Sequence, residues 1–196
     1  MPQADSPRQP ADGRPLSDRL LNMAPEVSRN IVEILENSRQ EFNAAAGGVA
    51  EPHAKTRPDE GRWSVLECVE HVTVVEERFL NRLEEAPKLD SPRIDRQKEA
   101  ELLVRVASRT NKAQAPEAVR PVGRFASLTQ ALEQFNAARS KTVEFAESRA
   151  AELYSLSAEH PRFGVLNGTE WMMLIAAHGR RHADQIREVR SALAQA

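Results

Sequence analysis

Two histidines one helical turn apart carry the clearest chemical signal in the sequence. The segment His178-Gly179-Arg180-Arg181-His182 places imidazoles at positions i and i+4, which lie about 6 Å apart between Cβ atoms in a helix. At 100° per residue, both histidines fall within an arc of about 120° that also holds the apolar side chains of this segment. Two inward imidazoles this close can bind one divalent metal ion. The spacing alone leaves open a second interpretation, in which both are hydrogen-bonded core residues.

His71 is the candidate for a third ligand. It belongs to an amphipathic segment whose apolar stripe includes Cys68, and it lies about 60° to one side of that residue. Such a position directs a side chain into the groove between neighbouring helices, where cofactor sites of helical bundles are built. Three protein ligands with open coordination positions are typical of a catalytic metal site. We therefore predict a divalent metal site at His71, His178 and His182.

Arg139 and Trp171 are candidates for contact with a substrate. Arg139 lies on the apolar face of its segment, where a guanidinium needs either an acid such as Glu76 or an anionic ligand. Trp171 could wall a pocket near the metal, although packing in the core is the simpler interpretation for it and for Trp63.

The lone cysteine and the remaining histidines have simpler interpretations. Because Cys68 is the only cysteine, the chain can form no intrachain disulfide. Cys68 lies on an apolar helix face, where a free cysteine usually packs as a small buried hydrophobe. A nucleophilic role for it is the alternative. His53 and His160 fall in predicted loops, and we expect His160 to help form its turn rather than to bind metal.

The elements that must position these residues are helices. Apolar residues at three- and four-residue steps predict helices over about 25–47, 64–86, 128–150 and 168–193. Ser64 with Glu67, and Asn167 with Glu170, have the spacing of helix-capping boxes. We therefore predict an all-α fold, a four-helix bundle with a long crossover between helices 2 and 3.

Two segments stand outside these four helices. For the crossover, residues 87–127, we expect a charged helix over 96–108. Such a long connection is often functional, for instance as a lid over a site. Residues 1–20 carry four of the twelve prolines and no apolar period, which predicts a flexible tail before a single domain over 21–196.

Composition excludes several classes of function. The formal net charge of -2 gives no basic field for phosphates, so nucleic acid is not an expected partner. No apolar run approaches the roughly 20 residues needed to cross a membrane, and the N-terminus lacks the apolar stretch of a signal peptide. The expected compartment is the cytoplasm.

Several motifs together resemble the DinB-like superfamily. Trp63-Ser64 followed by His71 resembles its second-helix signature, and His178-x-x-x-His182-x-x-Gln185-Ile186 resembles its fourth-helix signature. Three further motifs resemble the middle of the family: Ala115-Pro116 through Pro121-x-Gly123, Phe135-x-x-x-Arg139 and His160-Pro161-x-x-Gly164. The resemblance extends from about residue 25 to residue 193.

The resemblance implies a four-helix bundle that holds nickel, zinc or a similar divalent ion on three histidines, often as a homodimer. Family members include hydrolases and transferases or isomerases that use low-molecular-weight thiols such as bacillithiol and mycothiol. A set of three imidazoles suits Zn, Ni or Fe better than Mg or Ca. We therefore expect a metal-dependent thiol S-transferase or hydrolase acting on a small molecule. The alternative is a non-enzymatic bundle that binds a metal or small ligand as a sensor or interaction module.

Overall fold

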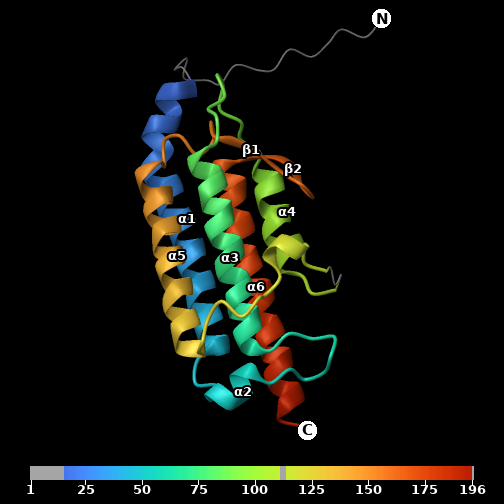
Figure 1. The fold of residues 1–196 in the computed structure, drawn as a ribbon. Helices are drawn as coiled ribbons and strands as arrows, with labels where there is room; N and C mark the ends of the chain where they lie inside the picture. Colours follow the sequence, from blue (N-terminus) through green and yellow to red (C-terminus); the bar gives the residue numbers. More distant parts are fainter. Residues whose placement is uncertain (1–15, 111–113, 196) are drawn as a thin grey trace, which may run out of the picture.

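The computed structural model describes residues 16–110 and 114–195, with side chains from residue 29 onward. Four long helices form a bundle (Figure 1), which confirms the predicted fold class. They are α1 (Leu16–Ala46), α3 (Val65–Glu84), α5 (Leu128–Ser148) and α6 (Gly168–Leu193). Three short helical elements join them: α2 (Glu51–Lys55), α4 (Arg96–Ala107) and the 3₁₀ turn η1 (Glu117–Val119).

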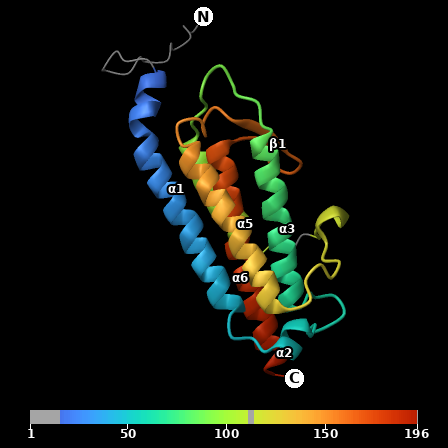
Figure 2. The same ribbon diagram turned by 60° about the vertical axis from the view of Figure 1, so that its left-hand side comes forward.

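The helices are not arranged in simple sequential order around the bundle. α1 packs against α5 and α6, and α3 packs against the same two helices, so the first two long helices lie across a diagonal. α1 and α6 run in one direction while α3 and α5 run in the other (Figures 1 and 2). The crossover from α3 to α5 makes this order possible, and its helix α4 lies along α6.

The ends of the helices follow the predicted signals, except at the beginning of α1. Capping boxes are formed by Ser64 with Glu67 before α3 and by Asn167 with Glu170 before α6. α1 begins at Leu16 and runs through Pro25, where the sequence predicted its start. An interior proline lacks one backbone N–H and crowds the preceding turn, yet α1 continues through this position. The remainder of the predicted tail, residues 1–15, lies outside the described residues.

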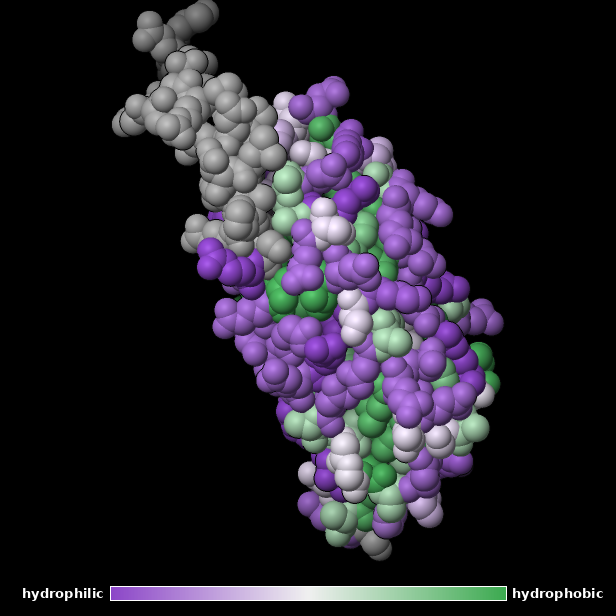
Figure 3. All heavy atoms as spheres, turned by 90° about the vertical axis from the view of Figure 1, so that its left-hand side faces the viewer, coloured by the Kyte–Doolittle hydropathy of each residue, from purple (hydrophilic) through white to green (hydrophobic). Residues whose placement is uncertain are grey.

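The core extends along the bundle in two clusters. One, around Leu35 and Trp171, fills the end near the α3–α4 connection, and the other, around Phe42 and Phe135, fills the end near α2. Figure 3 shows mainly hydrophilic residues on the outer face of α1 and α5, with hydrophobic residues visible in narrow bands between them. Among the described residues, no helix combines the length and apolar character needed to span a membrane.

A short hairpin precedes α6. β1 (Ser157–His160) pairs antiparallel with β2 (Gly164–Asn167), where the sequence predicted only a turn. The strands have four residues each and no clean alternation of burial, so no strand pattern could be recognised in the sequence. Gly164 has φ 68°, a conformation that glycine adopts readily at the end of a tight turn. The hairpin brings His160 against Trp171 and Phe79.

Candidate metal centre

His71 lies on α3 with one ring nitrogen already committed. The side chain is buried, and Nδ1 lies 2.7 Å from the carbonyl oxygen of Val119 in η1. A carbonyl can only accept, so Nδ1 carries the proton and donates it, and Nε2 keeps its lone pair. A histidine that donates its other N–H to a backbone carbonyl is the usual arrangement for a metal ligand.

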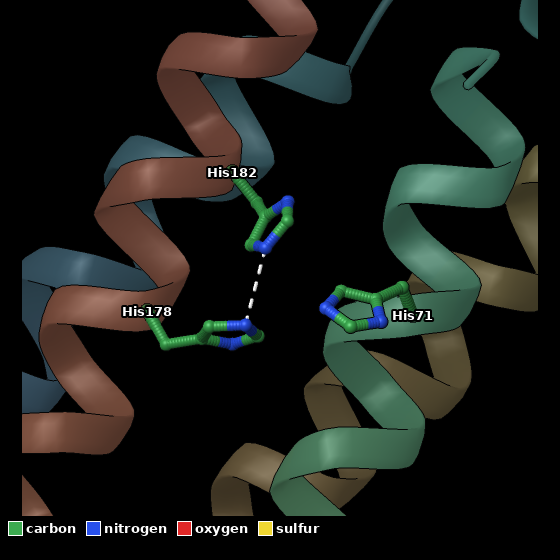
Figure 4. A group of neighbouring side chains, drawn as sticks. All are labelled: His71, His178 and His182. Atoms are coloured by element: carbon green, nitrogen blue, oxygen red, sulfur yellow. Dashed lines mark hydrogen bonds between the residues drawn. The ribbon is translucent and has the colours of Figure 1, made fainter. Parts of the chain in front are cut away.

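His178 and His182 lie one turn apart on α6, as their spacing predicted. Their Nε2 atoms approach to 3.1 Å, and their ring centroids lie 5.2 and 4.8 Å from that of His71. Figure 4 shows the free nitrogen of His71 facing the two rings from the opposite helix. One potential ligand atom from each of the three residues lies within 4.8 Å of the others.

The donor set and its spacing fit a divalent transition-metal ion. Two nitrogens bonded to one ion at about 2.05 Å are separated by about 2.9 Å at a right angle and about 3.3 Å at a tetrahedral angle. The observed 3.1 Å between the Nε2 atoms falls between these limits. His182 also has a buried Nδ1 without a hydrogen-bond partner, so protein groups alone leave this imidazole incompletely satisfied. These observations disfavour the interpretation of the pair as ordinary core histidines.

Burial keeps the three imidazoles neutral. It lowers the pKa of His71, against a smaller opposing effect of the hydrogen bond to Val119. The pKa values of His178 and His182 lie well below the usual 6.5, first because of burial and then because of neighbouring histidines and arginines. Neutral imidazole is the form that ligates metals, so the site is prepared for an ion near neutral pH.

Aromatic side chains line the site. The Trp63 ring centroid lies 4.8 Å from that of His71 and 6.3 Å from that of His182, nearly parallel to the latter. Phe79 lies 6.5 Å from His178 by the same measure. The sequence pattern favours packing alone for Trp63, because its approach to His182 depends on how α3 and α6 meet.

The two predicted substrate contacts occupy different surroundings. Trp171 is fully buried, donates Nε1–H to the carbonyl of Ala158 and packs edge-on against Phe79. Phe79 in turn contacts His178, so Trp171 supports the wall of the site from behind. Arg139 is also fully buried and pairs with Glu76. This is the internal ion pair that the sequence allowed, and it leaves no exposed guanidinium surface for a substrate anion.

Cys68, His160 and His53 lie outside the candidate centre. Cys68 is free, fully buried in the core, and its pKa is raised to about 12 by burial. This protonated thiol is not prepared to act as a nucleophile. His160 accepts backbone N–H groups of Arg162 and Phe163 on Nδ1, which forms the hairpin turn as predicted. His53 is exposed on α2.

The fold and the site together define a four-helix bundle with a three-histidine centre between two of its helices. Comparison with known proteins supplies the family: the DinB superfamily profile matches residues 34–186, and the chain belongs to this superfamily. The uncharacterized protein YuaE of Bacillus subtilis is 26% identical over 165 residues, which cover 84% of this chain and all of YuaE.

One solved structure confirms the bundle. YfiT from Bacillus subtilis, described as a probable metal-dependent hydrolase with an unusual four-helix bundle topology, superposes with a TM-score of 0.55. The match covers 95% of this chain and 94% of YfiT at 13% sequence identity. At this identity the likeness establishes the fold.

Proposed function

We propose that this protein is a metal-dependent enzyme in which His71, His178 and His182 hold one divalent ion that activates a thiol or a water molecule. The observation that carries the proposal is the convergence of three neutral imidazoles, with Nδ1 of His71 fixed on a backbone carbonyl. Membership of the DinB superfamily and the description of YfiT as a probable metal-dependent hydrolase support it.

An ion held by His71, His178 and His182 would keep open coordination positions for a reactant. An ion held by three imidazoles lowers the pKa of a thiol or water bound to it, so that a nucleophile is available near neutral pH. The protein contributes three imidazoles that burial keeps neutral, because it lowers the pKa of each. Trp63 and Phe79 provide apolar walls beside the ligands, which limit competing water and suit an apolar part of a small substrate.

Zinc, nickel and iron are the proposed ions, because imidazole nitrogen suits borderline transition metals better than Mg or Ca. The proposed setting is the cytoplasm, where low-molecular-weight thiols are kept reduced. The buried, protonated Cys68 is not a competing nucleophile, so the reacting thiol would come from a small molecule.

The first test is metal content. Freshly purified protein and the His182→Ala variant are analysed for bound elements, and both are titrated with Zn²⁺ and Ni²⁺. We expect about one ion per chain in the wild type and a large loss of affinity in the variant, with helical content preserved. Stoichiometric metal in the variant would place the site elsewhere.

The second test separates the two reactions. The metal-loaded and metal-free proteins are compared for hydrolysis of a nitrophenyl ester and for consumption of bacillithiol or mycothiol with a bimane electrophile. Metal-dependent turnover in either assay supports an enzyme. A protein that binds the ion tightly and turns over none of these probes or a wider panel would favour a sensor or binding module.

A further inference from the structure

A buried carboxylate stands directly beside the candidate ligand on α3. Glu70 precedes His71 and has a relative exposure of 2%. Oε1 accepts the backbone N–H groups of Val122 and Gly123 at 2.6 and 3.1 Å. Oε2 accepts that of Arg124 at 3.0 Å. A carboxylate in a concave row of backbone N–H groups forms a strong, charge-assisted attachment.

The carboxylate attaches the end of the crossover to α3. Gly123 has φ 81°, a conformation that lets successive N–H groups point toward one anion and that glycine adopts readily. A second contact lies on the surface, where the guanidinium of Arg124 pairs with Glu77. Glu70 is therefore the buried attachment of this segment, and Glu77 the exposed one.

The same segment carries the carbonyl that orients His71. Val119, whose oxygen receives the Nδ1–H of His71, lies three residues before Val122. Pro121 stands between them and restricts the backbone of its own and the preceding residue. The position of the Val119 carbonyl is thus tied to residues 122–124, which Glu70 holds.

We propose that Glu70 is a positioning residue of the three-histidine centre: it fixes residues 119–124 so that the Val119 carbonyl selects the tautomer and ring orientation of His71. This inference rests on the proposed function, in which His71 is a metal ligand. Glu70 touches no reacting atom; it acts through the backbone of the crossover, which returns to the adjacent residue on α3. A purely structural anchor would stabilise the crossover without changing which nitrogen of His71 is protonated.

The test compares Glu70→Gln and Glu70→Ala with Glu77→Gln as the matched control. The amide that Glu70→Gln introduces can still accept through one oxygen but loses the second acceptor, so the effect of this variant should be intermediate. Glu77→Gln weakens the exposed attachment and leaves the three backbone hydrogen bonds of Glu70 in place. Circular dichroism and thermal unfolding establish that each variant is folded, and Glu70→Gln serves if Glu70→Ala is not.

Two readouts are taken. In metal-free protein, ¹⁵N chemical shifts of the His71 ring report its tautomer. We expect the Nδ1–H form in the wild type and in Glu77→Gln, and a mixture of both tautomers in Glu70→Ala. Affinity for Zn²⁺, measured by chelator competition, should fall by about tenfold to a hundredfold in Glu70→Ala and by less than about twofold in Glu77→Gln.

The outcomes distinguish this inference from the proposed function. A folded Glu70→Ala variant with the wild-type tautomer and affinity overturns the positioning role. A wild-type protein that binds no ion overturns the proposed function, and the tautomer in metal-free protein then decides the role of Glu70 separately. Equal losses in Glu70→Ala and Glu77→Gln also count against the inference, because any weakening of the crossover would then have the same effect.

Discussion

The guanidinium of Arg139 on α5 and the carboxylate of Glu76 on α3 form a two-point ion pair inside the bundle. Nε and Nη2 of Arg139 donate to Oε1 and Oε2 of Glu76 at 2.6 and 2.8 Å, and Nη1 donates to the carbonyl of Leu35 on α1. Thr142 donates a further hydrogen bond to Oε1 of Glu76. The network joins three helices, and each of the three nitrogens of the guanidinium group makes a hydrogen bond.

Removal of one charge from this pair should strongly destabilise the protein. Glu76→Gln leaves the guanidinium of Arg139 buried without a counter-charge, and we expect a loss of about 3–5 kcal/mol in the free energy of unfolding, as for other broken buried pairs. Urea denaturation of the metal-free protein measures it. The double variant Arg139→Met, Glu76→Leu should recover much of the loss, because an apolar pair of similar size carries no desolvation cost. A loss below about 1 kcal/mol in Glu76→Gln would contradict this account.

The sequence was sufficient to predict those features that depend on a single helix. The histidine pair on α6, the two capping boxes and the buried stripe of α3 all depend on spacing within a single segment, and all were predicted. The approach of Val119 to His71 links residues 48 positions apart, and that of Glu70 to Val122 spans 52. These contacts depend on the path of the crossover, which no local period encodes.

The burial of further apolar residues on α3 and α6 could not be predicted from the sequence either. Val69 and Leu80 on α3 and Met172 on α6 lie outside the main apolar stripes of these helices, where the helical pattern alone does not predict burial. All three are buried within the single chain. α6 packs against α1, α3 and α4, so the helix of the crossover gives α6 a neighbour that a plain four-helix bundle would lack.

A homodimer remains a prediction that rests on the family resemblance. Multi-angle light scattering of the full chain at tens of micromolar should give twice the mass of one chain. A monomer under these conditions would contradict the prediction. Repetition after removal of metal by a chelator shows whether association depends on the ion.

Cys68 should be dispensable for metal binding. Its side chain is fully buried in the core, so Cys68→Ala should leave the metal content unchanged and lower the free energy of unfolding by about 1 kcal/mol through a small cavity. The native protein should react slowly with thiol reagents, because the thiol is inaccessible and its pKa is raised to about 12. Loss of metal in Cys68→Ala would show that the ligand set is assigned incorrectly.

The stability of the metal-free protein should fall as the pH falls below about 6.5. Burial lowers the pKa values of His71, His178 and His182 in the folded chain, and it lowers that of His160 to about 4. Unfolded histidines titrate near 6.5. Below that pH the unfolded chain binds protons that the folded chain does not, so unfolding becomes more favourable down to the folded pKa values.

Urea denaturation at several pH values between about 8 and 5 measures this effect. The slope should be smaller in His178→Ala, which removes one group whose pKa is strongly lowered. His53→Ala serves as the control for a histidine replacement at an exposed position outside the centre, on α2. A wild-type stability that is constant across this range would contradict the assignment of neutral, buried imidazoles.

Trp63 should report the arrival of the ion. Its ring lies 4.8 Å from His71 and 6.3 Å from His182 between centroids, whereas Trp171 is separated from His178 by Phe79. Titration with paramagnetic Ni²⁺ should therefore quench tryptophan fluorescence until one ion is bound per chain, mainly through Trp63. The matched variants are Trp63→Phe, which should lose most of the quenching, and Trp171→Phe, which should retain it. Quenching that survives in Trp63→Phe and disappears in Trp171→Phe would place the bound ion beside the hairpin instead of between α3 and α6.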